Sequence, residues 1–278
     1  MQVGQPSRTA LAVAYARAYH QLADVPPVFV DPLALRIAGA AVDELTQWDV
    51  GLDPDLARRR RLFLAGRSRF AEDTVAQAVA AGTGQVVVLG AGLDTFGCRN
   101  PYDGVRVFEV DHPSTQAWKR TRLAEADIAV PETLTFAPVD FEHESLADGL
   151  RAAGFDREAP AVFVWLGVVM YLTRDAIMTT LRYIADQNSA TVVVFDYLYP
   201  PSAAQAGAAQ QQRADRVAAA GEPWLTFFTA PGLTDDLRAI GFEDVEDLSA
   251  PELLARYLGS PLAQSRDTGP HVVRAARN

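Results

Sequence analysis

Residues 85–92 of the 278-residue chain read Gln-Val-Val-Val-Leu-Gly-Ala-Gly. The first five residues form a short apolar run rich in β-branched side chains, which is typical of a buried strand. Gly90 and Gly92 allow the backbone to turn tightly and a ligand to approach it, because glycine has no Cβ atom. The stretch predicts a buried strand that enters a ligand-binding turn. On this stretch alone, a plain turn between a strand and a helix is the alternative.

Similar apolar runs recur along the chain and alternate with segments of helical pattern. They cover residues 105–110, 134–139, 161–166 and 191–195, and two further runs joined by a long link cover 242–248 and 271–275. Strands that alternate with helices build a parallel sheet with right-handed crossovers. We therefore expect an α/β fold with a doubly wound, Rossmann-like sheet.

Helical patterns precede and interrupt this sheet. Residues 1–81 combine alanine-rich and leucine-rich stretches with prolines and predict a helical cap, in which 56–80 is the longest helix. Residues 82–278 are expected to form the ligand-binding domain. An aromatic and helical lid is inserted in it at about 198–232, after the fifth strand, with an alanine- and glutamine-rich helix over 202–221. Since no flexible linker is found, cap and domain should form one compact unit.

Composition excludes several classes of partner. The formal net charge of −10 repels phosphate backbones, so no nucleic acid is expected to bind, and a solvated helix face explains the basic run 58–61. The single cysteine, Cys98, excludes an internal disulfide, and no Cys/His spacing suits a metal ion. The first residues, with Gln2, Arg8 and many alanines, lack the continuous apolar core of a signal peptide, and no apolar run of 18 residues occurs, so we expect a cytoplasmic protein that does not contact membranes. A homo-oligomer is compatible with the sequence.

The glycine turn does not match a dinucleotide site. A dinucleotide fingerprint has a third glycine three residues after the second, and this chain has Thr95 there. Asp94 lies where a pyrophosphate would meet the helix N-terminus, and its carboxylate would repel that group. The turn therefore favours a nucleoside ligand that carries no phosphate.

Acidic residues end the next two strands of the predicted sheet. The second strand ends in Glu109-Val110-Asp111, where a carboxylate can accept hydrogen bonds from ribose hydroxyls. Glu109 and Asp111 share one strand face, so either could serve, and we prefer Asp111 because it lies further into the crevice. The third strand ends in Asp140-Phe141, which could bind the exocyclic amine and the ring of adenine; Asp140 could equally cap a helix that begins near Glu144.

The chain resembles the leucine carboxyl methyltransferase-like family, which includes bacterial small-molecule O-methyltransferases. The segments that carry the resemblance run from residue 7 to about 275 and lie in the same order. They are Ser7-Arg8-Thr9-Ala10, Phe29-Val30-Asp31-Pro32, Arg67-Ser68-Arg69-Phe70, Leu89-Gly90-Ala91-Gly92-Leu93-Asp94-Thr95, Glu109-Val110-Asp111-His112-Pro113, Val139-Asp140-Phe141 and Trp165-Leu166-Gly167-Val168-Val169-Met170-Tyr171-Leu172.

The resemblance implies a seven-stranded methyltransferase sheet with S-adenosylmethionine as methyl donor. It assigns Gly90, in the turn with Gly92, to the methionine moiety, Asp111 to the ribose and Asp140-Phe141 to the adenine. Arg67 matches the arginine that holds the methionine carboxylate, a contact that suits a bidentate guanidinium. Arg69 and Arg17 are weaker candidates for that contact. Eukaryotic members carry a glutamate where this chain has Leu166, so we expect a small-molecule acceptor rather than a protein phosphatase.

Aromatic residues near the expected crevice are candidates for binding the methyl acceptor. They are Tyr15, Tyr19, Tyr171, Tyr197, Tyr199, Trp224, Phe227 and Phe228. Their number favours an apolar or aromatic acceptor, such as a polyketide-like natural product of secondary metabolism. An acceptor carboxylate is ionised at neutral pH and needs no base, whereas a phenol benefits from one. Candidate bases are His112, His143 and Tyr197.

Two other functions stay open at this point. A nicotinamide-dependent oxidoreductase could use the same sheet, although Thr95 replaces the third glycine. A non-catalytic protein that binds S-adenosylmethionine is the second alternative, because function resides in the site rather than in the fold.

Overall fold

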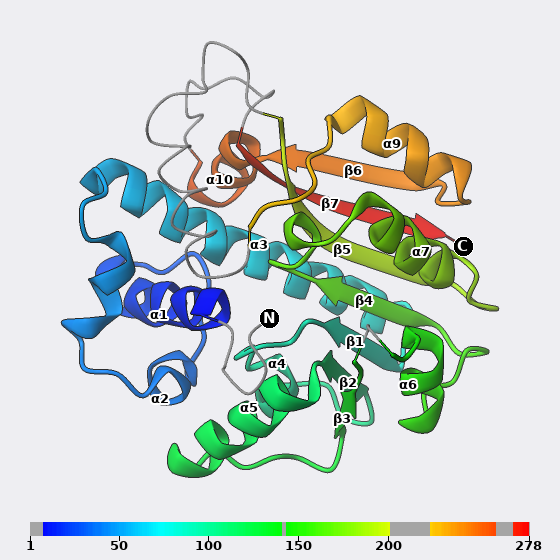
Figure 1. The fold of residues 1–278 in the computed structure, drawn as a ribbon, viewed down its shortest axis with the longest axis horizontal. Coiled ribbons are helices and arrows are strands. Elements are labelled where there is room, and N and C mark those ends of the chain that lie inside the picture. Colours follow the sequence, from blue (N-terminus) through cyan, green and yellow to red (C-terminus); the bar gives the residue numbers. More distant parts are fainter. Residues whose placement is uncertain (1–7, 141–142, 201–222, 260–268, 278) are drawn as a thin grey trace.

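The computed structural model describes residues 8–140, 143–200, 223–259 and 269–277, and a seven-stranded sheet forms its centre. The strand order is β3-β2-β1-β4-β5-β7-β6 (Figure 1). The strands are β1 (Gln85–Leu89), β2 (Arg106–Asp111), β3 (Leu134–Pro138), β4 (Ala161–Trp165), β5 (Thr191–Leu198), β6 (Asp244–Ser249) and β7 (Pro270–Arg277). The first five are parallel, and β7 runs antiparallel to both of its neighbours. The predicted Rossmann-like α/β sheet is confirmed.

Helices cover both faces of this sheet. Helices α3 and α10 pack on one face, and α6, α7 and α9 contact strands on the other. The helices are α1 (Arg8–Ala23), α2 (Ala34–Ala38), η1 (Glu44–Asp49), α3 (Pro54–Ala80), α4 (Phe96–Arg99), α5 (Pro113–Glu125), α6 (Leu146–Ala152), η2 (Val169–Tyr171), α7 (Arg174–Ala185), α9 (Ala230–Ala239) and α10 (Ala250–Leu258).

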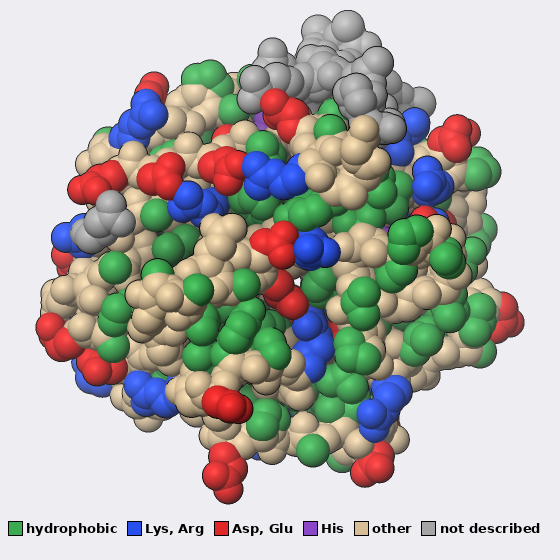
Figure 2. Space-filling view, turned by 180° about the vertical axis from the view of Figure 1, so that it is seen from behind, with side chains coloured by type: hydrophobic (Ala, Val, Ile, Leu, Met, Phe, Trp, Pro, Cys, Tyr) green, Lys and Arg blue, Asp and Glu red, His purple; other side chains and the backbone are tan. Residues whose placement is uncertain are grey.

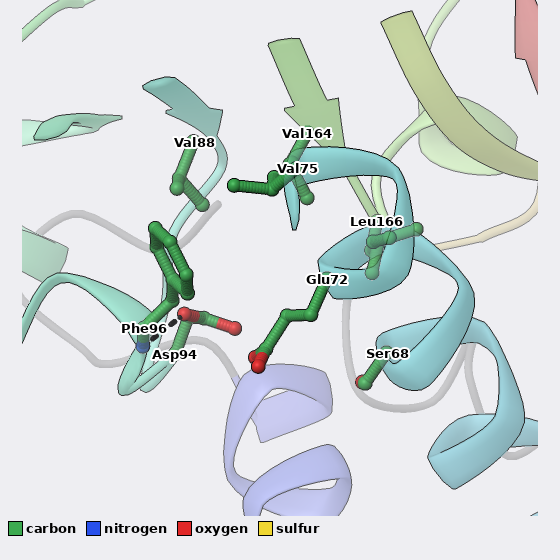
Figure 3. Close-up of a pocket in the computed structure, with 9 residues that line it drawn as sticks. Ser68, Glu72, Val75, Val88, Asp94, Phe96, Val164 and Leu166 are labelled. Carbon is green, nitrogen blue, oxygen red and sulfur yellow. Dashed lines mark hydrogen bonds between the residues drawn. The ribbon is translucent and has the colours of Figure 1, made fainter. Parts of the chain in front are cut away.

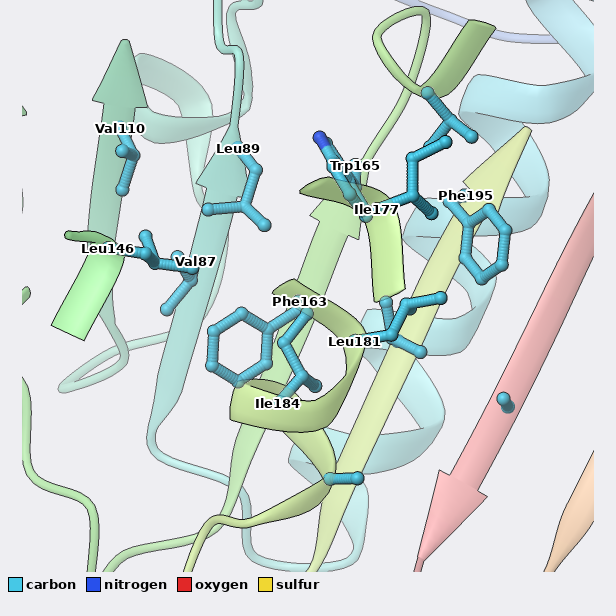
Figure 4. Close-up of a cluster of buried hydrophobic side chains, with 14 of the residues drawn as sticks. Val87, Leu89, Val110, Leu146, Phe163, Trp165, Ile177, Leu181, Ile184 and Phe195 are labelled. Atoms are coloured by element: carbon cyan, nitrogen blue, oxygen red, sulfur yellow. The ribbon is translucent and has the colours of Figure 1, made fainter. Parts of the chain in front are cut away.

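Alternation along the strands divides the core into two layers. Val86 and Val88 of β1 pack with Val75 of α3, whereas Val87 and Leu89 join the cluster beneath α7 (Figure 4). Successive side chains of a strand point to opposite faces of a sheet, and a parallel strand covered on both faces is therefore apolar throughout. The continuous apolar run 85–89 has this physical cause.

The long helix α3 links the N-terminal helices to the sheet. Asp53 caps its first turn by accepting a hydrogen bond from the Leu56 amide, and Pro54 occupies the first helical position, which suits proline. Its Phe63 and Phe70 pack against the sheet in one cluster with Val194. The N-terminal helices therefore lie directly on the sheet through α3.

The region after β5 differs in part from the sequence expectation. The predicted helix over 202–221 and most of the predicted lid lie outside the described residues, and α9 begins at Ala230. The long link expected between the last two strands contains helix α10. Ser249 and Glu252 form a capping box at its start, a sequence signal that could have revealed it. None of the described helices is long and apolar enough to cross a membrane.

Candidate functional site

A cavity of about 860 Å³ lies at the carboxyl ends of the parallel strands, against α1 and α3. Open α/β sheets bind ligands at this edge. The ends of β1, β2, β4 and β5 contribute Leu89, Asp111, Val164 and Asp196 to its wall. Acidic and basic side chains meet around a hollow near the middle of the face that Figure 2 shows. The fold thus places side chains from four strands, two of them carboxylates, around one cavity.

The turn after β1 requires glycine at two positions of the wall. Gly90 has a φ of +63° and Gly92 a φ of +48°, which is the left-handed region that L side chains rarely adopt. A Cβ on residue 90 would lie 2.4 Å from Cγ2 of Val168, and one on residue 92 would lie 3.1 Å from Cβ of Ala10. These glycines let the loop after β4 and helix α1 approach the turn closely.

Of the two acids that end β2, Asp111 faces the cavity. Its Oδ2 accepts a hydrogen bond from the Gly92 amide and its Oδ1 one from the His112 amide, each at 2.7 Å. Glu109 is fully buried and accepts a hydrogen bond from Nζ of Lys119 at 2.5 Å, away from the cavity wall. Burial raises the pKa of Asp111, although the two amides act to lower it. The Thr115 side chain is a third hydrogen-bond partner, and a carboxylate has about four acceptor positions, so Asp111 retains capacity for a further hydrogen bond from a ligand hydroxyl.

Arg67 projects from α3 into the same cavity and is 5% exposed. Its Nη1 donates to Oδ2 of Asp196, and Oδ1 of Asp196 accepts a hydrogen bond from the Gly167 amide at 2.6 Å. Nε of Arg67 is buried and has no hydrogen-bond partner among the described residues. A buried orphan donor is costly unless a ligand acceptor satisfies it. Asp196 was not predicted; a charged residue near the end of a buried strand was one sequence signal for it.

A second, water-sized cavity of about 20 Å³ adjoins the first and shares Ser68 and Asp94 with it. Glu72 and Asp94 are directed toward each other across it (Figure 3). Burial raises the pKa of Glu72, against the effect of its ion pair with Arg99. Burial acts in the same direction on Asp94, but Arg17, Lys119 and Arg99 hold the pKa of Asp94 below its usual value. The Asp94 carboxylate is therefore ionised at neutral pH.

Thr95, at the position of the missing third glycine, points away from the cavity. Its side chain is fully buried, and Oγ1 donates to Oδ2 of Asp31 at 2.7 Å. The same carboxylate oxygen lies 2.9 Å from Nε of Arg17, and Nη2 of that arginine donates to the Leu93 carbonyl. This part of the turn anchors the N-terminal helices instead of approaching a pyrophosphate.

Asp140 lies outside the described wall of the cavity, and Phe141 lies outside the described residues. Oδ2 of Asp140 is 3.0 Å from Nδ1 of His143. The alternative that Asp140 caps the following helix is wrong, because α6 begins at Leu146 and Ser145 provides the cap by accepting from the Asp148 amide at 3.1 Å. The adenine contact of Asp140 and Phe141 stays a prediction.

Of the aromatic candidates for acceptor binding, Tyr171 and Trp224 line the cavity. The others are placed elsewhere by packing. Tyr15 and Tyr19 pack among α1, α2 and η1, and Tyr199 stacks on His271. Phe228 and Tyr197 belong to the core cluster beneath α7, and Phe227 does not line the cavity. The structure therefore brings two of the eight candidates to the site.

The candidate bases do not line the cavity in the part of the chain that the structure describes. His112 caps α5 and its Nδ1 is 2.7 Å from Oγ of Ser114, while the His143 side chain is 74% exposed. Tyr197 is fully buried, and its hydroxyl donates to Oδ2 of Asp247 at 2.7 Å. Burial and the Asp247 charge raise the pKa of Tyr197 further above its usual value. None of these three groups is placed to take a proton from a molecule in the cavity.

Two arginines of the basic run that was expected to form a solvated helix face line the cavity; Arg59 is also exposed, as expected, whereas Arg60 is only partly exposed. Arg59 and Arg60 lie about two turns before Arg67 on α3, among the apolar wall residues Leu56 and Phe63. Nη1 of Arg60 is 3.2 Å from Oδ1 of Asp49, and burial lowers the pKa of Arg60. The spacing of 60 and 67, two turns on one helix face, was the available signal.

Similar solved structures share the α/β fold of this chain. A methyltransferase from Thermobifida fusca, described as putative in its published name, aligns over 100% of this chain and 97% of its own, with a TM-score of 0.60 at 16% identity. A protein of the duf574 family from Streptomyces avermitilis aligns over 95% and 97%, with a TM-score of 0.57 at 15% identity. At these identities the likeness shows the fold.

The sequence comparisons then give the family. The model described as "Leucine carboxyl methyltransferase" matches residues 10–185, and the chain belongs to that family. A protein of Bacillus subtilis named "Putative S-adenosyl-L-methionine-dependent methyltransferase YktD" is 29% identical over 91% of each chain. One of Streptomyces coelicolor, "Putative S-adenosyl-L-methionine-dependent methyltransferase SCO7813", is 37% identical over 67% of this chain and 68% of its own. The predicted family of methyltransferases is confirmed.

Proposed function

We propose that this protein transfers the methyl group of S-adenosylmethionine to a carboxylate oxygen of a small, largely apolar molecule. Two features of the cavity suit the donor. The buried, unpartnered Nε of Arg67 can donate to the methionine carboxylate, and Asp111 retains acceptor capacity for ribose hydroxyls. Gly90 supports the same assignment, since no side chain separates the turn from a ligand.

The chemistry of the other cavity residues favours a carboxylate acceptor. Arg59 and Arg60 are cations that can pair with it, whereas none of the four histidines is among the described residues of the wall. A carboxylate is ionised at neutral pH, but a phenol with a pKa near 10 gains from a base. This combination of arginines with no histidine is the observation that carries the proposal.

The transfer is an in-line displacement that needs no proton movement. S-adenosylmethionine supplies a methyl group activated by a sulfonium. The acceptor oxygen forms a bond to the methyl carbon while the carbon–sulfur bond breaks. The electron pair of the carbon–sulfur bond stays on sulfur. The protein's part is to align acceptor and donor and to exclude water, and such alignment lowers the barrier by removing the entropy cost of the encounter.

The size and wall of the cavity support an acceptor of natural-product type. Its volume of about 860 Å³ is near the upper end of the range for small-molecule sites, so donor and acceptor can be enclosed together. Trp224, Leu52, Met170 and Leu198 make the wall beside the arginines apolar. An anion with an apolar body, such as a polyketide-derived acid of secondary metabolism, matches this combination.

Transfer of a labelled methyl group to matched acceptors tests the proposal. We expect an aromatic or aliphatic acid to give a base-labile methyl ester, and the corresponding alcohol or phenol of the same skeleton to give no product. Arg60→Gln should raise KM for the acid with little change in donor binding. Arg58→Gln, at an exposed position of the same helix, is the control. Methylation of the phenol in preference to the acid would contradict the carboxylate assignment, and donor binding without turnover of any acceptor would favour a non-catalytic role.

A further inference from the structure

The ion pair between Arg67 and Asp196 connects the donor side of the cavity to the end of β5. Both side chains are almost fully buried, at 6% and 1% exposed, and both line the cavity. Burying a guanidinium and a carboxylate is favourable only where additional hydrogen bonds satisfy their remaining atoms. Burying this ion pair therefore costs free energy. Packing of the sheet alone does not require an ion pair at this position.

The hydrogen bonds of the pair fix the orientation of the guanidinium. Asp196 is itself held by the Gly167 amide at 2.6 Å, and its other oxygen accepts from Nη1 of Arg67. Nη1 is the guanidinium nitrogen on the side of Cδ. Nε and Nη2 form the opposite edge, which has two parallel N–H groups and can bind a carboxylate in bidentate fashion. Nε on that edge is the buried atom that lacks a partner.

Glycine at position 167 leaves room for the same edge. Gly167 has a φ of +75°, and a Cβ there would lie 3.0 Å from Nη2 of Arg67. The loop after β4 therefore contributes both the amide that holds Asp196 and the space beside Nη2. Three elements, α3, β5 and this loop, converge on one arginine.

We infer that Asp196 is a positioning residue, which turns the Nε–Nη2 edge of Arg67 toward the carboxylate of the donor's methionine moiety. The inference rests on the proposed function, because it takes S-adenosylmethionine as the ligand. Asp196 acts through Arg67 and does not contact the donor's ammonium. Loss of the Asp196 charge then weakens the binding of ligands that carry the carboxylate and does not change the binding of ligands that lack it.

Three ligands separate this role from others in calorimetric titration of the full chain. S-adenosylhomocysteine carries carboxylate and ammonium, its decarboxylated analogue carries the ammonium alone, and 5′-methylthioadenosine carries neither group. For Asp196→Asn we expect at least tenfold weaker binding of S-adenosylhomocysteine and less than twofold change for the other two ligands. Arg67→Lys, which keeps the charge but has no bidentate edge, should show the same selectivity. Adding Asp196→Asn to Arg67→Lys should cause little further loss.

Asp247→Asn is the matched control, because Asp247 accepts hydrogen bonds from the buried side chains of Tyr197 and His271 in the same sheet and does not line the cavity. Its thermal unfolding reports the loss of stability expected from removing a partly buried carboxylate, and its ligand selectivity should match that of wild type. Equal weakening of all three ligands by Asp196→Asn would show a merely structural role and overturn the inference. Weaker binding of the decarboxylated analogue by Asp196→Asn would show that Asp196 contacts the ammonium directly, and this result would also overturn the inference. If wild type binds none of the three ligands, the proposed function itself fails.

Discussion

Gly90→Ala tests whether the turn after β1 is built for close approach. The substitution has two costs. A left-handed φ of +63° costs an L residue about 1–2 kcal/mol. The new Cβ would also lie 2.4 Å from Cγ2 of Val168, far inside the contact distance of about 3.5–4.0 Å, and such overpacking costs about 1–3 kcal/mol. Together these terms predict a loss of about 2–5 kcal/mol in the free energy of unfolding.

Two further variants separate the terms. Gly104 has a φ of +76° with nothing within 4 Å of an added Cβ, so Gly104→Ala should lose only the backbone term of about 1–2 kcal/mol. Val168→Ala removes Cγ2 and leaves Cβ at 3.5 Å as the nearest atom to residue 90. In the Val168→Ala background, Gly90→Ala should therefore lower the free energy of unfolding by no more than Gly104→Ala does in wild type. Urea unfolding at equilibrium measures the stabilities of wild type and of the four variants, and titration with S-adenosylhomocysteine measures whether the displaced Val168 obstructs the cavity. Equal stability of Gly90→Ala and wild type, or no rescue by Val168→Ala, would refute the reasoning.

Three further predictions concern residues outside the cavity. Lys119→Met leaves the buried Glu109 carboxylate without its cation and should cost about 3–5 kcal/mol of stability at pH 7. Since burial already raises the pKa of Glu109, the loss of stability should shrink as the pH falls and Glu109 takes up a proton. Urea unfolding measures it, and an equal loss at pH 7 and pH 5 would contradict this protonation. Burial raises the pKa of the Cys98 thiol to about 11, so only about one part in a thousand is thiolate at pH 8 and iodoacetamide should alkylate the native protein slowly. Fast labelling at pH 8 would contradict that assignment. Tyr197→Phe should cost about 1–3 kcal/mol of stability by removing the hydrogen bond to Asp247, with methyl transfer at the wild-type rate at a temperature where both proteins are folded.

The sequence predicts the sheet well because strand formation and burial have one local cause. The apolar run 85–89 matches β1, and the run 134–139 differs from β3 by one residue. Helix α10 was missed although its nine residues carry local signals: a capping box of Ser249 and Glu252, Pro251 in the first turn, apolar residues at helical spacing, and Gly259 at the end. Its short length hid this pattern within the link between two strands.

The candidate site is predictable where function depends on backbone geometry at strand ends. Gly90, Gly92 and Asp111 reach the cavity because they directly follow or end strands whose position the sheet fixes. Aromatic residues further along are decided by packing that one sequence does not display. Tyr197 alternates with Asp196 and Leu198 on β5, and the latter two line the cavity while Tyr197 points into the core on the opposite face. Strand alternation could have excluded Tyr197 and indicated Asp196.

Calorimetric titration with S-adenosylhomocysteine tests the central claim, that this cavity binds the methyl donor. We predict micromolar binding to wild type and a loss of at least about tenfold in Asp111→Ala, because a hydrogen bond to a charged group contributes about 1.5–3 kcal/mol. Asp148→Ala, at an exposed position in the first turn of α6 that does not line the cavity, should bind as wild type does. Undetectable binding to wild type, or equal binding to wild type and Asp111→Ala, would contradict the account.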